Sequence, residues 1–249
     1  MADAWLELSQ ISKSYPGVVA LDRVDLAVRA GEVLGLIGEN GAGKSTLMKI
    51  LGGVTEPSSG TIRLNGTTRA ALTIADANAG GIAFVHQELN LFDNLDVAAN
   101  VFIGREPLQG GPLRLVDRGA LRRRVQPLLD RLGVDFGPDT PVSELSLAQM
   151  QAVEIAKALS LDARLVIMDE PTSSLTLTET EYLMRIIADL KATGVSIIFI
   201  SHRLNEVERC ADRVVVLYEG RAIYFGPVAD LEKSEHPHIQ EFLAMDRVA

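Results

Sequence analysis

The sequence is poor in the residues that mark several classes of protein. Its 249 residues include one cysteine, Cys210, which excludes an internal disulfide and fits a reducing compartment. Acidic residues outnumber basic ones by 33 to 24, and the net charge of −9 argues against general nucleic-acid binding. The one basic run, residues 122–124, fits the solvated face of a helix better than a docking patch. We therefore expect no nucleic-acid partner.

Long apolar runs are missing as well. The longest, residues 195–200 and 214–218, have the length of a strand and fall short of the roughly 20 residues that span a bilayer. The first seven residues lack the basic-then-apolar pattern of a signal peptide. If the protein works at a membrane, we expect another protein to hold it there.

Residues 38–46 satisfy the phosphate-binding pattern G-x-x-x-x-G-K-[ST]. The loop consists of Gly38, Glu39, Asn40, Gly41, Ala42, Gly43, Lys44, Ser45 and Thr46. A short apolar strand, residues 33–37, precedes it, and a helix, residues 47–51, follows it and stops at two glycines. In that context the backbone N–H groups and the helix N-terminus surround a phosphate. Lys44 would reach the terminal phosphates and Ser45 would hold Mg²⁺.

Three further apolar strands are each followed by polar residues. Residues 82–85 lead to Gln87, residues 164–169 end in Asp169 followed by Glu170, and residues 195–200 lead to His202. In open α/β sheets, ligands bind beyond the carboxyl ends of the strands. Gln87 is therefore placed to reach a phosphate or its metal.

Asp169 and Glu170 form a pair of carboxylates whose burial requires cationic partners. Mg²⁺ on a nucleotide phosphate fits best, with Asp169 holding the metal and Glu170 facing an attacking water. A lone histidine is more often structural, but His202 follows the third strand to end in polar groups. A γ-phosphate contact is therefore the better interpretation.

Two other residues keep alternative interpretations at this stage. Tyr15 either anchors a turn-rich loop, residues 12–17, or stacks on a nucleotide base. Ser146 stands where a helix N-cap belongs, with free N–H groups just beyond it. An ordinary cap is the simpler interpretation of Ser146.

The order of these patterns predicts one α/β domain. Residues 5–30 alternate like antiparallel strands, whereas residues 90–160 show helical periodicity. Because strand patterns resume afterwards, we expect a helical subdomain inserted into the α/β core. The helices expected there are residues 96–103, residues 117–132 and a helix from about Leu147, with a glycine- and proline-rich connector at 107–112 and a buried stripe made by Val153, Ala156, Leu159 and Ser160. The tail, residues 228–249, is expected to hold one helix.

Taken together, the motifs resemble the ATP-binding subunit of ABC transporters. Residues 84–89 are similar to the Q-loop, 145–149 to the signature, 165–170 to Walker B and 200–202 to the H-loop. The resemblance implies one ABC-type ATP-binding domain over residues 4–245. It implies an α/β P-loop NTPase core with a mixed, largely parallel sheet, an antiparallel β subdomain and the helical insertion. Tyr15 would stack on adenine, and Ser146, Ala148 and Gln149 would bind the nucleotide of a facing domain.

Three stretches are similar to bacterial monosaccharide importers of the ribose, xylose and galactoside type. They are residues 85–106, 151–160 and 168–176. Many of those proteins carry two such domains, whereas this chain shows one set of motifs, so it is expected to be a stand-alone subunit or the first half of a longer protein. Leu147 and Ala148 replace both signature glycines, and Thr176 replaces the aspartate usual after Walker B.

The resemblance implies an ATPase that drives transport. Two domains, as a homodimer or a paired domain, would enclose ATP and Mg²⁺, with Glu170, His202 and Gln87 as catalytic residues and Ser45, Gln87 and Asp169 at the metal. The partners would be a polytopic membrane permease and, indirectly, a periplasmic substrate-binding protein, at the cytoplasmic face of the inner (plasma) membrane. The alternatives are an ATPase of a lipid or other transporter and a soluble ABC ATPase without a transport role.

Overall fold

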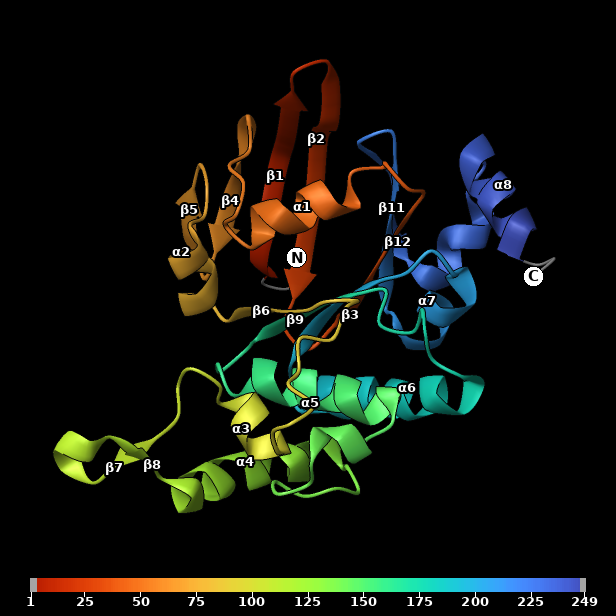
Figure 1. The fold of residues 1–249 in the computed structure, drawn as a ribbon. Helices are drawn as coiled ribbons and strands as arrows, with labels where there is room; N and C mark the ends of the chain where they lie inside the picture. Colours follow the sequence, from red (N-terminus) through yellow and green to blue (C-terminus); the bar gives the residue numbers. More distant parts are fainter. Residues whose placement is uncertain (1–3, 247–249) are drawn as a thin grey trace.

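Two large β-sheets and a group of helices are arranged around the phosphate-binding loop in the computed structural model, which describes residues 4–246 (Figure 1). The central sheet has the strand order β12-β11-β3-β10-β9-β6, in which β12 alone is antiparallel to its neighbour. Its strands are β3 (Val33–Gly38), β6 (Ile82–Val85), β9 (Leu165–Asp169), β10 (Ser196–Ile200), β11 (Arg213–Tyr218) and β12 (Arg221–Pro227). The parallel strands β3, β6, β9 and β10 all end at one edge, and the polar motif residues follow them there.

Alternation along the central strands divides the core into two clusters. Val166 and Met168 of β9 pack into one cluster with the helices below the sheet, while Leu165 and Ile167 pack into the other. Successive side chains of a strand point to opposite faces, so a strand buried on both faces is apolar at every position. This explains why the central strands appear in the sequence as unbroken apolar runs.

The second sheet is antiparallel and lies on the P-loop side of the core (Figure 1). Its order is β2-β1-β4-β5, with β1 (Ala4–Tyr15), β2 (Val18–Arg29), β4 (Ser59–Leu64) and β5 (Thr67–Arg69). The prediction of a loop at residues 12–17 is wrong for most of that range, because β1 continues to Tyr15, which pairs with Val18. Only Pro16 and Gly17 form the turn, so Tyr15 is held by a strand.

The helices follow the predicted pattern with adjusted ends. They are α1 (Lys44–Leu51), α2 (Ile74–Ala79), α3 (Val97–Val101), α4 (Arg118–Leu132), α5 (Leu147–Leu159), α6 (Leu177–Ala192), α7 (Leu204–Cys210) and α8 (Pro237–Asp246). Helices α3, α4 and α5 form the helical part below the sheet (Figure 1). No helix among residues 4–246 is both long enough and apolar enough to cross a membrane. These elements confirm the α/β fold with its antiparallel and helical parts.

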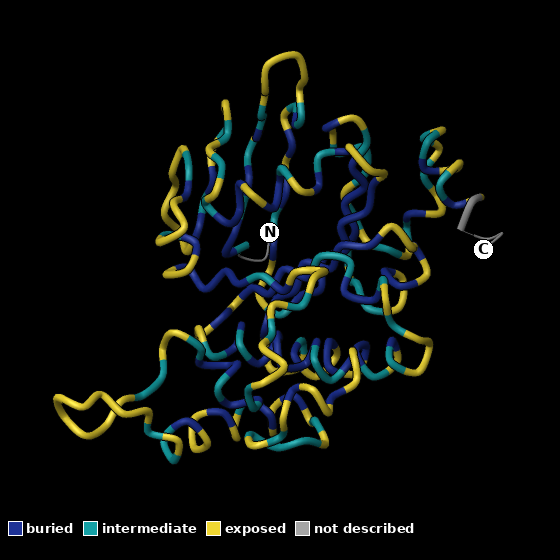
Figure 2. Tube along the Cα trace, in the orientation of Figure 1, coloured by how far each residue is buried: buried dark blue, intermediate teal, exposed yellow. Residues whose placement is uncertain are grey.

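Two expectations about the helical part are corrected. Helix α5 is buried on nearly all sides rather than along one stripe, because it lies between β6 and the helices α3, α4 and α6. Ser160 is only half-buried and caps the end of that helix. The expected connector at residues 107–112 belongs instead to a small hairpin, in which β7 (Leu108–Gln109) pairs with β8 (Leu115–Val116). The hairpin projects from the helical part and is exposed throughout (Figure 2).

Candidate functional site

The phosphate-binding loop passes so close to its neighbours that a side chain does not fit at two of its glycines. A Cβ on Gly43 would lie 2.6 Å from the Ala20 carbonyl oxygen, and one on Gly38 would lie 2.5 Å from the Leu217 carbonyl oxygen. Gly43 also has φ 108°, a left-handed conformation that glycine adopts without strain, and it forms the N-cap of α1. The loop is therefore a tight cradle that opens onto the N-terminus of a helix.

Lys44 is buried within this cradle. Its ammonium donates hydrogen bonds to the carbonyl oxygens of Gly38 and Glu39, the latter at 3.1 Å. Burial lowers the pKa of Lys44, and the carboxylates of Glu170 and Asp169 oppose that shift. A cation held among carbonyl groups and next to two acids is positioned to bind an anion that enters the loop.

The two acids lie where β9 ends. Burial raises the pKa of Asp169, and the neighbouring carboxylate of Glu170 raises it further. Glu170 has φ 45°, in the left-handed region, and its N–H donates to the carbonyl oxygen of Ile200 at 3.0 Å. This backbone conformation turns the Glu170 side chain toward His202, whose Nδ1 lies 3.3 Å from Glu170 Oε1.

A cleft of about 610 Å³ brings most of the predicted residues together. It is lined by Tyr15, Val18, Val19, Ala20, Glu39, Asn40, Gly41, Gly43, Lys44, Ser45, Thr46, Gln87, Asp169 and Glu170. Gly38 and Ala42 do not line it; Gly38 accepts the Lys44 hydrogen bond and Ala42 is buried in the core. Tyr15 is 40% exposed, and the ammonium of Lys13 lies 5.2 Å from its ring centroid.

Sequence reasoning missed two parts of this site. Val18 and Val19 begin β2 beside Tyr15, and both are 58% exposed. In the sequence, the signal that could have identified them was a pair of valines just after the turn that follows Tyr15. The amide of Gln87 also donates to Ser173 Oγ at 3.3 Å, which links the Q-loop to the segment after Walker B. Residues 87 and 173 are too far apart in the chain for their spacing to predict this contact.

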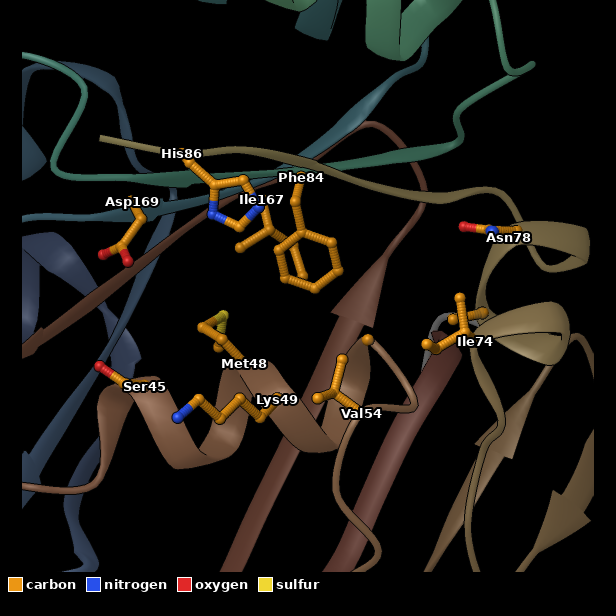
Figure 3. A pocket seen from close by; sticks show the side chains of 12 residues that line it. Ser45, Met48, Lys49, Val54, Ile74, Asn78, Phe84, His86, Ile167 and Asp169 are labelled. Atoms are coloured by element: carbon orange, nitrogen blue, oxygen red, sulfur yellow. The ribbon is translucent and has the colours of Figure 1, made fainter. Parts of the chain in front are cut away.

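A second pocket adjoins the cleft and shares Ser45 and Asp169 with it (Figure 3). Its volume is about 310 Å³, and its polar end is formed by Ser45, Asp169 and His86. The rest is mostly apolar, with Met48 and Phe84 facing across it. The pocket lies between α1, α2 and β6, behind the loop that holds Lys44.

The donor atoms at the cleft suit magnesium. A hydroxyl from Ser45, a carboxylate from Asp169 and an amide oxygen from Gln87 are hard oxygen ligands, which Mg²⁺ prefers together with water and phosphate oxygens. Among residues 4–246, no group of three His, Cys, Asp or Glu side chains could hold a metal without such additional ligands.

Ser146, Ala148 and Gln149 lie outside this cleft, at the start of α5. Ser146 and Gln149 form a capping box, in which Ser146 N–H donates to the Gln149 side chain at 2.9 Å and Gln149 N–H donates back at 3.3 Å. Ala148 is buried. The ordinary cap expected for Ser146 is confirmed, and contact with a facing nucleotide stays a prediction.

Comparisons with known proteins agree on one family. The family model described as ABC transporter matches residues 21–173. "Putative ribose/galactose/methyl galactoside import ATP-binding protein 1" of Agrobacterium fabrum is 55% identical over 218 residues, which cover 88% of this chain and 43% of that protein. The ribose import ATP-binding protein of Rhodopirellula baltica is 51% identical over 218 residues, 88% of this chain and 42% of that protein. The chain thus spans less than half the length of these curated relatives.

Solved structures support the same assignment. An ATP-binding cassette of an ABC transporter in its ADP conformation has a TM-score of 0.84 and 25% identity, covering 97% of this chain and 99% of that one. A nucleotide-free cassette from an ABC transporter has a TM-score of 0.83 at the same identity and coverage. The order of motifs, the cleft and these similarities lead to one conclusion: the chain belongs to the ABC transporter family.

Proposed function

We propose that residues 4–245 form the ATP-binding and hydrolysing cassette that powers an ABC importer for a monosaccharide. One observation carries the enzymatic part: Lys44, Asp169 and Glu170 converge on a single cleft, and His202 contacts Glu170. The import of ribose, galactose or methyl galactoside is what the names of the relatives state, and it supports the sugar assignment.

The cleft offers separate contacts for each part of ATP. The exposed ring of Tyr15 and the adjacent Val18 would take the adenine, since an aromatic face and apolar side chains suit a flat base. The amides of the loop and the ammonium of Lys44 would bind the β- and γ-phosphates. Mg²⁺, held by Ser45, Asp169 and Gln87, would neutralise phosphate charge.

Glu170 is the proposed general base. Its carboxylate would accept a proton from the water that attacks the γ-phosphate, while His202 holds that carboxylate and contacts the same phosphate. The hydrogen bond from Gln87 to Ser173 joins the cleft to the loop before α6. Because α6 packs against α5, a change at the phosphate would have a route toward the helical part.

A second cassette would complete the site. The start of α5 would face the nucleotide of the partner, and Ser146 would give up its cap to do so. Leu147 and Ala148 are helical residues, so the absence of both signature glycines leaves the helix start regular.

The surface at residues 88–106 would dock a polytopic permease at the cytoplasmic face of the inner membrane, with a periplasmic sugar-binding protein acting through that permease. Affinity capture of the tagged protein from its native membranes tests this part. Recovery of a polytopic permease encoded beside a periplasmic sugar-binding protein is the expected result. Recovery of a permease of another type would contradict the assignment of a sugar as the substrate. Recovery of soluble partners alone would contradict a role in transport.

Magnesium-dependent ATP hydrolysis by the purified protein tests the enzymatic part separately. The matched pair is Glu170→Gln, which removes the proposed base, and Glu219→Gln, which neutralises an acid outside the cleft. If the Glu170→Gln variant hydrolyses ATP at an unchanged rate, Glu170 is not the general base.

A further inference from the structure

The β7–β8 hairpin is a surface that the proposed ATPase does not use. Its register pairs Leu108 with Val116 and Gln109 with Leu115, and its base is closed by a 2.7 Å hydrogen bond from Asp117 N–H to the Pro107 carbonyl oxygen. The hairpin projects from the helical part, away from both sheets (Figure 1). Its tip is a short 3₁₀ turn, Gly111–Leu113.

Four large apolar side chains of this hairpin are exposed. Leu113 at the tip is 74% exposed, Leu115 is 55%, Leu108 is 46% and Val116 is 43%. The register puts Leu108 and Val116 on one face and Leu115 on the other, so both faces are apolar. A cluster of exposed apolar side chains on a protein surface marks an interaction site, because contact of these side chains with water is unfavourable.

Positive charge accompanies these side chains. Residues 114–124 contain five arginines and one aspartate, in a chain whose net charge is −9. The aspartate, Asp117, caps α4 by accepting from Ala120 N–H at 2.8 Å, and Arg122 pairs with Asp139. Within residues 4–246, the other arginines of this segment have no ion-pair partner; they are Arg114, Arg118, Arg123 and Arg124.

We propose that residues 108–124 are a contact site for an anionic phospholipid surface. The leucines at the hairpin tip enter the headgroup region, and the exposed arginines at its base bind lipid phosphates. Apolar area combined with positive charge is the composition that gives binding to such surfaces. The exposed arginines match the negative charge of these lipids.

The shape of the hairpin favours a lipid over a protein groove. Both faces and the tip are apolar, so a protein partner would have to enclose the hairpin from every side. Lipid headgroups and acyl chains surround an inserted tip without a preformed shape. This site lies on the helical part and requires neither ATP nor the residues of the cleft, so it holds or fails independently of the proposed ATPase.

Vesicle sedimentation tests the proposal. The purified protein is mixed with vesicles of phosphatidylcholine alone or of phosphatidylcholine with an equal amount of phosphatidylglycerol. We expect it to bind the anionic vesicles, more weakly at high salt, because salt screens the arginine contacts. The triple change Arg118→Gln, Arg123→Gln and Arg124→Gln should lower the partition coefficient roughly a hundredfold, since each charge is worth about fivefold.

A second set of variants tests the contribution of the apolar side chains to vesicle binding. Leu113→Glu with Leu115→Glu should lower vesicle binding at least tenfold, by roughly the transfer cost of apolar side chains. The control is Leu177→Glu, at a leucine that is 87% exposed on α6, and it should bind as the unchanged protein does. All these positions are exposed, so the variants should keep the circular-dichroism spectrum of the fold.

Fluorescence distinguishes insertion from charge attraction alone. In a Trp5→Phe background, Leu113→Trp places the single tryptophan at the tip, and its emission should shift to the blue on anionic vesicles. Vesicle binding that is absent, or that the arginine and leucine variants leave unchanged, would overturn the proposal. Cross-linking of position 113 to the permease without any vesicle binding would overturn it in favour of a protein partner.

Discussion

Nδ1 of His202 lies 3.3 Å from Oε1 of Glu170, although the two residues follow different strands of the central sheet. β9 and β10 are parallel neighbours, with Asp169 in register with Ile200, so both chains leave the sheet at the same level. The left-handed backbone at Glu170 then turns its carboxylate toward the histidine. This contact joins the proposed base to the residue that would orient it.

Glu170→Gln should keep ATP binding and lose at least about a hundredfold in hydrolysis, because an amide cannot accept the proton from water. ATP affinity is measured by equilibrium binding and turnover by phosphate release. Loss of binding together with turnover would mean that Glu170 holds the nucleotide or the fold instead of acting as a base.

His202→Ala should lower turnover by roughly a hundredfold, since the substitution removes both the contact to Glu170 and the proposed phosphate donor. His202 is exposed, so the free energy of unfolding should change little. The control is His236→Ala, in the tail. Equal turnover in both variants would show that the His202–Glu170 contact is without catalytic effect.

Lys44→Ala should weaken Mg-ATP binding at least tenfold, because a charge-assisted contact to the phosphates is lost. Lys49→Ala removes the same charge five residues further along α1, from an exposed position, and should leave affinity within a factor of about two. Calorimetric titration measures both. Tight binding by the Lys44 variant would contradict the role of the cradle.

Ser146→Ala removes a helix cap and should lower the free energy of unfolding by about 1 kcal/mol, as measured in urea. Thr73→Ala removes the corresponding capping box from α2, which takes no part in the proposed contact with the facing nucleotide, and should cost a similar amount. Only the Ser146 variant should also slow ATP hydrolysis. Identical turnover in the two variants would leave Ser146 with a structural role alone.

Cys210 should resist alkylation in the folded protein. Burial raises the pKa of its thiol to about 12, and the thiol donates to the Glu206 carbonyl oxygen at 3.3 Å. A raised pKa keeps the thiol protonated at pH 8, and the reactive thiolate is present only at about one part in ten thousand. Maleimide labelling should therefore be slow until urea unfolds the chain, whereas rapid labelling of the folded chain would show that α7 opens locally.

The sequence by itself determined the central features of the site. Glycine spacing and the lysine–serine pair specify the phosphate-binding loop at residues 38–46, and apolar runs specify the strands before Gln87, Asp169 and His202. Since parallel strands end at one edge of a sheet, local patterns were sufficient to predict that these residues gather there. The capping boxes were equally local, because three residues separate the two members of each.

The tertiary structure decided what covers each surface. Periodicity shows which face of a segment is apolar, but it cannot show whether another element packs on the opposite face. Helix α5 is buried on nearly all sides because β6 and three helices surround it, while the leucines of the β7–β8 hairpin are exposed because no element covers them. The contacts of His202 with Glu170 and of Gln87 with Ser173 likewise depend on long-range strand order and a left-handed residue, which residue spacing does not encode.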